Sequence, residues 1–206
     1  MTRTPSIECA TAFRVSLDMR SVCLTDDQFD LLCRDNPELR LELSAEGELI
    51  IMPPVYTEGG WRETRISYRL AQWTEQDGTG FCFGSSTGFR LPNGAKRSPD
   101  ASWIARSRWN RLSSEQRTKF APICPDFVVE VRSATDPLRE SQKKMTEYLQ
   151  NGARLGWLLD PIEKRVQIYR PGRRVEYRNN PEYLDGEDVL PGFRFNFQEI
   201  LQELMS

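Results

Sequence analysis

The first half of the chain alternates between strand-like and helix-like hydrophobic patterns. Thr25 is placed to cap a short helix that carries apolar residues on one side. Residues 40–43 and 48–52 predict a β-hairpin that turns at Gly47 and ends before two prolines. Apolar residues then recur at helical spacing over 61–76. These patterns predict a helix, a hairpin and a longer helix, in that order.

The second half contains many short apolar segments of strand length. Strands are predicted over 81–91 and 98–105, and the polar stretch 106–121 offers a capped short helix. A buried strand over 125–131 leads to a helix over 138–151. Further strands are predicted over 155–161, 165–172 and 172–178, and a short helix is predicted in the tail of the chain.

The order of these elements predicts an α/β (α+β) fold, with a central mixed β-sheet flanked by helices. A strand, a helix and a second strand follow one another over 126–160, as in a right-handed crossover. The sequence has no internal repeat, low-complexity stretch or linker. We therefore expect an irregular lead-in over 1–24 and a single domain over 25–206, which begins with a helix and a β-hairpin.

The segment "PDFVVEVRS", residues 125–133, places a charge within an apolar strand. Its β-branched and aromatic residues suit a strand buried on both faces, but Glu130 lies among them. An isolated carboxylate in an apolar setting costs several kcal/mol unless it is paired, protonated or metal-bound. The period of a strand places Glu130 and Arg132 on one face. Either a bound cation or an ion pair with Arg132 therefore explains the buried charge.

Composition excludes several reaction mechanisms. The chain of 206 residues has no histidine, which excludes Ser-His-Asp triads, Cys-His pairs and HExxH zinc sites. The five cysteines form no CxxC pair, so we expect no structural zinc and a reduced, cytoplasmic setting. No apolar run approaches the ~18 residues of a membrane span. We therefore expect no membrane partner.

Two segments that contain Pro-Asp bring acidic residues toward the predicted sheet. They are "SPDASWI" and "PDFVVEV". If Asp100 begins a strand next to the strand of Glu130, the two carboxylates converge. Two carboxylates and a backbone carbonyl supply oxygen ligands for a hard divalent cation, Mg²⁺ or Mn²⁺. Such a cation activates water and stabilises charge on a phosphoryl oxygen.

Five segments together carry a resemblance to a known family. They are "LELSAEGELIIMPP", "GFRLPNGAKRSPDASWI", "PDFVVEVRSATD", "KMTEYLQNGARLGWLLDP" and "YLDGEDVLPGF", which occur in that order over about residues 25–201. The chain resembles the Uma-two family of restriction endonucleases, within the PD-(D/E)xK nuclease superfamily. This resemblance implies a restriction-endonuclease-like core and the hydrolysis of DNA phosphodiester bonds.

The resemblance also implies roles for individual residues. Asp100 and Glu130 match the metal ligands, and the backbone carbonyl of Val131 matches a third ligand. The lysine of the superfamily normally stands two residues after the glutamate, where this chain has Arg132. In this family a lysine on the following helix takes its place, and Lys144 matches it. The implied catalytic residues are Asp100, Glu130 and Lys144.

The helical pattern favours Lys144 over its neighbour Lys143. The family pattern is a lysine, three residues and a tyrosine, which Lys144 and Tyr148 match. A helical turn of ~3.6 residues places Lys144 and Tyr148 on one side, beside the apolar face, and turns Lys143 toward water. A lysine orients or deprotonates a water molecule, whereas an arginine only holds charge. Tyr148 suits either a core position or an auxiliary one.

Three further residues are candidates for the same site. Glu42 matches an acidic position in the first family segment and could approach the site. Glu63 stands where family members often have a histidine, which makes it a candidate auxiliary ligand. Arg132 stands where the family usually has an apolar residue, and it could neutralise Glu130 without any metal.

Local positive charge is present in a chain whose formal net charge is −2. Residues 162–178 contain six basic and two acidic residues, and residues 106–119 contain five basic and one acidic. These segments suit a phosphate backbone, although two solvated faces would explain them equally well. The candidate contacts to nucleic acid are Arg165, Arg170, Arg173 and Arg174.

The sequence thus favours a Mg²⁺- or Mn²⁺-dependent endonuclease that acts on DNA. A second hypothesis is a catalytically weakened nucleic-acid-binding protein in which Arg132 replaces the metal charge. A glycosidase with two carboxylates is disfavoured, because it explains neither Arg132 nor Lys144. By analogy with the superfamily we also expect a homodimer.

Overall fold

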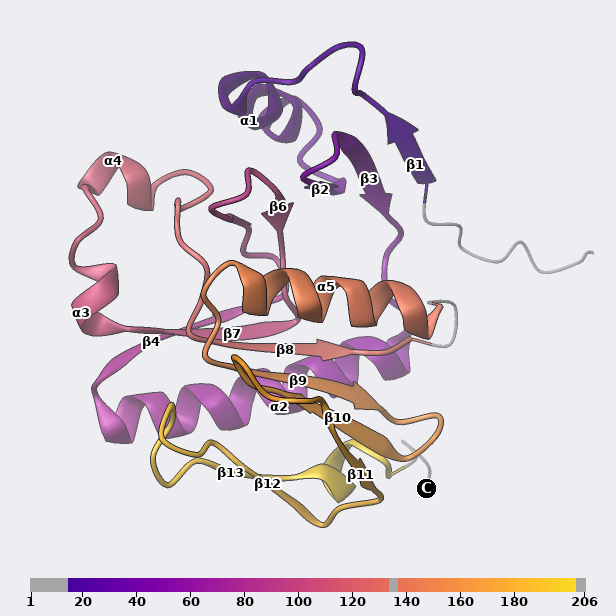
Figure 1. The fold of residues 1–206 in the computed structure, drawn as a ribbon, viewed down its shortest axis with the longest axis vertical. Coiled ribbons are helices and arrows are strands. Elements are labelled where there is room, and N and C mark those ends of the chain that lie inside the picture. The colour runs from indigo at the N-terminus through magenta and orange to yellow at the C-terminus, as the bar shows by residue number, and fades with distance from the viewer. Residues whose placement is uncertain (1–14, 134–136, 203–206) are drawn as a thin grey trace, which may run out of the picture.

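The computed structural model describes residues 15–133 and 137–202, which form a mixed α/β fold (Figure 1). The larger sheet has six strands in the order β11-β10-β9-β8-β7-β4. Strands β8 and β9 are parallel and the other neighbouring pairs are antiparallel, which confirms the predicted mixed sheet. Its strands are β4 (Gly80–Gly84), β7 (Ala101–Ala105), β8 (Phe127–Val131), β9 (Leu155–Asp160), β10 (Arg165–Tyr169) and β11 (Glu176–Asn179).

A smaller sheet and a separate hairpin complete the β-structure. The smaller sheet has the order β1-β3-β2-β6-β5 and contains the predicted hairpin, β2 with β3. Its strands are β1 (Val15–Asp18), β2 (Arg40–Leu43), β3 (Glu48–Met52), β5 (Phe89–Arg90) and β6 (Lys96–Arg97). The separate hairpin pairs β12 (Tyr183–Asp185) with β13 (Arg194–Asn196).

Capping residues explain where helix α1 begins and where helix α2 ends. Thr25 caps α1, as the sequence predicts, and the structure adds a reciprocal capping box with Gln28. Gly78 ends α2 with a φ of 70°, a left-handed conformation that glycine adopts without steric cost. The helices are α1 (Asp26–Asp35), α2 (Thr57–Asp77), α3 (Arg106–Trp109), α4 (Ser114–Arg117), α5 (Leu138–Gln150) and the 3-10 helix η1 (Phe197–Ile200).

The large sheet is covered on both faces, and strand β8 shows how. Phe127 and Val129 pack into a core that includes residues of α2 and of the β12–β13 hairpin. Val128 faces the opposite side, into a core that contains Met145 and Tyr148 of α5. Helices α2 and α5 therefore lie on opposite faces of the sheet (Figure 1). A strand between two covered faces is buried throughout, which explains its nearly continuous apolar sequence.

The expectation of an irregular lead-in over 1–24 was wrong for Val15–Asp18, which form strand β1. This strand pairs antiparallel with β3, and all four of its residues are exposed. An exposed edge strand is held by its backbone hydrogen bonds, so its side chains carry little signal of burial. The rest of the expectation for 1–14 lies outside the described residues.

The segment predicted as one strand over 81–91 is two strands in different sheets. The chain leaves the large sheet after β4 and turns at Gly84, whose carbonyl accepts from the backbone N–H of Thr87. It then enters the small sheet as β5. The strand predicted over 98–105 begins only at Ala101, so Asp100 lies just before it. The chain changes sheets because β4 pairs with β7 of the large sheet, whereas β5 joins the small sheet through β6. A local hydrophobic pattern does not show such pairing.

Two further boundaries differ from the prediction. Helix α2 begins at Thr57, earlier than the predicted helix over 61–76. The tail contains the β12–β13 hairpin and ends the described chain with a turn of 3-10 helix. Strands of three residues are too short to show a period. None of the helices in the described part of the chain is both long and apolar enough to span a membrane.

Candidate active site

Asp100 and Glu130 come from adjacent strands and approach the same pocket. Ala101 of β7 lies opposite Val129 of β8, so the antiparallel register brings Asp100 beside Glu130. The Asp100 carboxylate accepts a hydrogen bond from the backbone N–H of Val131 at 2.7 Å. Asp100 is 8% exposed and Glu130 is 7% exposed. Both side chains line a pocket of about 220 Å³ at the end of β8.

Helix α5 supplies two side chains that contact the Glu130 carboxylate. The Nζ of Lys144 lies 3.0 Å from Oε2 of Glu130, and the Tyr148 hydroxyl donates to Oε1 at 3.0 Å. The two residues are four positions apart and therefore share one side of the helix. Lys143 instead pairs with Glu140 at the surface, where its side chain is 60% exposed. The predicted difference between the two lysines is thus present in the structure.

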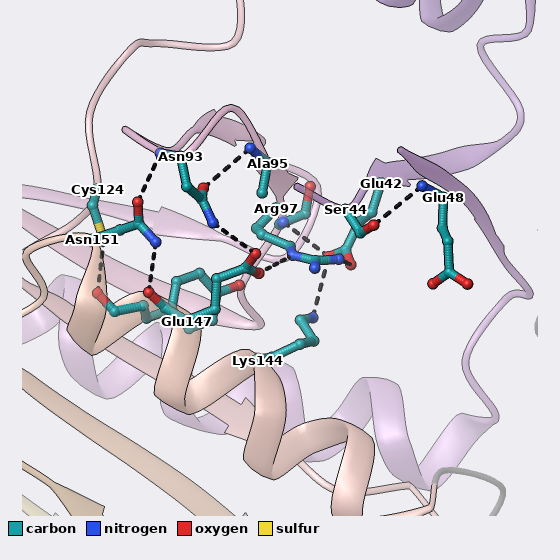
Figure 2. A network of polar contacts seen from close by, with 12 residues as sticks. Glu42, Ser44, Glu48, Asn93, Ala95, Arg97, Cys124, Lys144, Glu147 and Asn151 are labelled. Carbon is teal, nitrogen blue, oxygen red and sulfur yellow. Dashed lines mark hydrogen bonds and ion pairs between the residues drawn. The ribbon is translucent and has the colours of Figure 1, made fainter. Parts of the chain in front are cut away.

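Glu42 of β2 holds the other side of Lys144. Its carboxylate lies 3.1 Å from Nζ of Lys144 and 3.2 Å from Nη1 of Arg97, and it accepts from the backbone N–H of Ser98 at 3.0 Å. Arg97 also contacts Glu147 of α5 at 2.5 Å. Figure 2 shows these side chains between β2 and α5. The small sheet is therefore joined to α5 by a chain of buried charges.

Glu63 reaches the pocket from α2, on the other side of the sheet from α5. It is 9% exposed and lines the pocket together with Asp100 and Arg40. Burial raises the pKa of Glu63, while a hydrogen bond with Ser85 and the charge of Arg40 act in the opposite direction. An Nη2 atom of Arg40 lies 3.9 Å from the Asp100 carboxylate. The predicted carboxylates Asp100, Glu130 and Glu63 thus share one pocket.

Burial and mutual repulsion raise the pKa values of the two central carboxylates. Burial raises the pKa of Asp100 to about 7, with a further contribution from the negative charge of Glu63. Burial also raises the pKa of Glu130 to about 7, and repulsion from Asp100 adds to it while Lys144 opposes it. Removal from water and the proximity of like charges both disfavour the ionised form. This site therefore favours an additional positive charge.

Glu42 and Lys144 have the opposite electrostatic balance. Burial opposes the charge on Glu42, but Lys144 and Arg97 outweigh it and lower the pKa to about 2. Burial also opposes the charge on Lys144, but Glu130 and Glu42 outweigh it and raise the pKa of the amine. Glu42 is thus a permanent anion near neutral pH, and Lys144 is held beside it as an ammonium ion.

Arg132 follows the last residue of β8 and lines the same pocket. Its guanidinium lies 2.7 Å from Oδ2 of Asp160, at the end of the parallel neighbour β9. The other oxygen of Asp160 accepts from the backbone N–H groups of Ile162 and Glu163, as expected for a residue that caps a turn. Arg132 therefore has a buried acidic partner on β9.

The four arginines predicted to contact nucleic acid do not lie together. Arg165 is level with Asp160, at the end of the sheet that carries the pocket. Arg170 is only 13% exposed in its side chain and is paired with Glu187 and Glu176. The register of β10 with β9 places the turn after Tyr169 at the opposite end of the sheet. Arg173 and Arg174 lie in that turn and are exposed.

Sequence reasoning did not single out three basic residues near the pocket: Arg40, Arg62 and Arg97. Arg40 and Arg62 line the pocket, and Arg97 lies behind Lys144 in contact with Glu42. The buried Nε of Arg40 has no hydrogen-bond partner among the described residues. For Arg97 a signal was present in the basic pair of "GAKRSPD", which ends at Asp100. Their proximity arises from the tertiary packing of β2, β6 and α2.

Among the described residues, no three Asp, Glu or Cys side chains form a ready-made metal cluster. Asp100 and Glu130 are nevertheless two buried carboxylates in one pocket, with raised pKa values. Carboxylate and carbonyl oxygens are the donors that Mg²⁺ and Mn²⁺ prefer. The chemistry of this donor set fits a hard divalent cation.

Known proteins resemble this chain in fold and in sequence. A crystal structure described as a putative nuclease belonging to DUF820, from Anabaena variabilis, aligns with a TM-score of 0.71 and 21% identity, over 86% of this chain and 97% of that one. At this identity the likeness shows a shared fold. A search of curated proteins found no match. The model of the Uma2 family, described as "Putative restriction endonuclease", matches residues 26–198, and the chain therefore belongs to this family.

Proposed function

We propose that the protein is a divalent-metal-dependent endonuclease that hydrolyses phosphodiester bonds of DNA. The observation that carries this proposal is the meeting of Asp100, Glu130 and Lys144 at one pocket. Membership of a family of restriction endonucleases and the nuclease-like fold support a nuclease role. Two carboxylates with one lysine suit the positioning of a cation and a water molecule beside a phosphate.

Asp100 and Glu130 would hold the cation, Mg²⁺ or Mn²⁺, together with the backbone carbonyl of Val131. In an antiparallel strand the N–H and C=O of one residue face the same neighbour. The N–H of Val131 donates to Asp100, so the backbone of this residue lies beside the two carboxylates and its carbonyl would be the third ligand. When bound, the cation would lower the pKa of water and neutralise charge on the phosphate.

The side chains of the protein have complementary roles around this donor set. Lys144 donates hydrogen bonds as an ammonium ion and would orient the attacking water. Glu42 is a positioning residue, because it contacts Lys144 at 3.1 Å and holds it from the side away from Glu130. Tyr148 fixes the Glu130 carboxylate through its hydroxyl. Glu63 lines the pocket from α2 and would act as an auxiliary acid.

Basic side chains at the pocket would receive the phosphate. The pocket-lining residues include four cations, Arg40, Arg62, Arg132 and Lys144, against four acids, Glu58, Glu63, Asp100 and Glu130. A bound divalent cation would make this balance positive, which suits a polyanionic substrate. The unpartnered Nε of Arg40 offers a donor to a phosphate oxygen. The hypothesis that Arg132 replaces the metal gains no support, because Arg132 pairs with Asp160 and Lys144 contacts Glu130.

We further propose that the protein acts as a homodimer in the cytoplasm. The cysteines Cys23, Cys33, Cys82 and Cys124 are free thiols, which suits a reducing compartment. Closed twofold dimers are the commonest oligomers of soluble proteins, and one would present two copies of this pocket to DNA. Sedimentation equilibrium would test the dimer, since a monomer at micromolar concentration would contradict it.

The nicking of supercoiled plasmid in the presence of Mn²⁺ tests the endonuclease function. We expect the wild type to nick the plasmid and to bind Mn²⁺ in isothermal titration, and Asp100→Ala to lose both properties. Asp188→Ala is a matched control, because this aspartate is 84% exposed in its side chain and does not line the pocket. Plasmid nicking by Asp100→Ala at the rate of the wild type would contradict the proposal.

A further inference from the structure

The residues that line the pocket include a charged set and an apolar set, and the proposed chemistry uses only the charged set. The apolar set consists of five consecutive residues, from the last residue of β3 to the N-cap of α2, and we call them the apolar wall: Met52, Pro53, Pro54, Val55 and Tyr56. Tyr56 is 56% exposed and Val55 is 43% exposed. An exposed aromatic residue beside buried catalytic carboxylates indicates a surface that a ligand covers.

The apolar wall is held in place by its backbone. Pro53 and Pro54 each fix one backbone dihedral and so restrict the loop. Tyr56 is the N-cap residue of α2, and its carbonyl accepts from the backbone N–H of Gly60 at 3.0 Å. Helix α2 is itself anchored in the core through Ile66 and Leu70. The backbone of Tyr56 is therefore fixed beside the pocket, which lowers the cost of ordering the side chain on binding.

A DNA strand presents the two surfaces that this pocket requires. Its phosphates suit the charged residues of the pocket. The base attached to a neighbouring sugar offers a flat apolar face to the apolar wall. Stacking of a base on an aromatic side chain does not depend on sequence, because every base has such a face. In a duplex both faces of each base are already covered by its neighbours. A base therefore reaches the wall only from a single strand or from a locally opened duplex.

We propose that the apolar wall, which ends at the exposed ring of Tyr56, binds an unpaired nucleobase next to the phosphate that is cut. This inference rests on the proposed endonuclease function and adds the substrate class, which is single-stranded or locally unpaired DNA. The wall would act as a binding surface for the base, and it has no part in the chemical step.

Fluorescence anisotropy of labelled oligonucleotides tests the base site without any cleavage. The three ligands are a 12-nucleotide oligothymidylate, the same strand paired with its complement, and a 12-unit strand of abasic deoxyribose phosphates, all in metal-free buffer of low ionic strength. We expect the wild type to bind the oligothymidylate about 5- to 100-fold more tightly than the abasic strand, as one stacked base would produce. It should also bind the single strand more tightly than the duplex.

The variants separate stacking from charge. Tyr56→Ala should lose this 5- to 100-fold advantage and bind both single strands with the affinity of the wild type for the abasic one. Tyr56→Phe keeps the ring and should retain the affinity of the wild type for oligothymidylate. Tyr177→Ala is a matched control, because Tyr177 is also 56% exposed but lies on β11. Thermal melts of each variant establish that it is folded.

Three outcomes would overturn the inference. They are unchanged binding of oligothymidylate by folded Tyr56→Ala, equal losses in Tyr56→Phe and Tyr56→Ala, and a preference of the wild type for the duplex. Plasmid nicking separates this inference from the endonuclease proposal. If wild type nicks with Mn²⁺ but Tyr56→Ala binds normally, only the base site is wrong. If base-dependent binding is present and no metal supports nicking, only the endonuclease function is wrong.

Discussion

At the scale of single residues, Glu130 combines features that a structural ion pair alone does not require. It is buried at the end of a central strand, its pKa is raised to about 7 by burial, and both Lys144 and Tyr148 contact it. Buried pairs of charges seldom stabilise a fold more than apolar residues of the same size. A site that retains two acids and one lysine in a pocket is therefore better explained by function.

The different surroundings of two adjacent lysines give the first prediction at this scale. Lys144→Ala should reduce Mn²⁺-supported plasmid nicking by roughly 10²–10³-fold, the typical cost of removing one preorganised hydrogen-bond donor. Its affinity for Mn²⁺ should change little, because the lysine is not a ligand. Lys143→Ala, from the exposed side of the same helix, should nick like the wild type. The assignment would be wrong if Arg132→Ala abolished nicking while Lys144→Ala remained active.

At the scale of elements, Glu42 joins strand β2 to helix α5. It contacts Lys144 directly and contacts Glu147 through Arg97 (Figure 2). Glu42 precedes Lys144 by 102 positions, so only the folding of the chain brings the two side chains together. This connection fixes the helix that carries Lys144 relative to both sheets, so the geometry of the site depends on a residue outside the large sheet.

The lowered pKa of Glu42 predicts how this connection responds to acid. Its pKa is about 2 in the folded protein, compared with an ordinary value of 4.5, so the stabilisation is present above pH 4.5 and is lost as the pH falls toward 2. Glu42→Gln should lower the free energy of unfolding at pH 7 by roughly 2–3 kcal/mol, and this difference should shrink below pH 4. Urea unfolding at several pH values measures it.

Glu48→Gln is the matched control for this prediction, because Glu48 lies exposed on the neighbouring strand β3. The free energy of unfolding of Glu48→Gln should equal that of the wild type at every pH. A constant difference between Glu42→Gln and wild type from pH 7 to pH 2.5 would show that the ionisation of Glu42 does not stabilise the fold.

At the scale of the whole molecule, the pocket lies where several elements meet, so ligand binding there should stabilise the entire fold. Residues of β2, α2, β8 and α5 all line it. A cation that binds only the folded protein stabilises it by mass action. In ~10 mM Mg²⁺, wild type should melt a few degrees higher than without metal. Glu130→Gln should show no such shift in the same calorimetric scans, and equal shifts in both proteins would place the stabilising cation elsewhere.

The sequence by itself determined much of the local structure. The capping box of α1, the β2–β3 hairpin and the β8-α5-β9 unit follow from capping residues, turn residues and hydrophobic periods. The choice of Lys144 over Lys143 also followed from a helical period, because a period of ~3.6 residues fixes which side chains share a face. These features depend on residues close together in the chain, and for that reason they could be read from it.

Only the tertiary structure decided which distant groups meet. The exposed strand β1, the passage from β4 to β5 between sheets, and the pairing of Arg132 with Asp160 all depend on partners far away in sequence. The predicted basic segment over 162–178 was divided in the same way, because Arg170 pairs with acids and the turn that follows lies at the far end of the sheet. Local patterns record the period of burial, whereas charge pairing and strand order are set by packing across the whole fold.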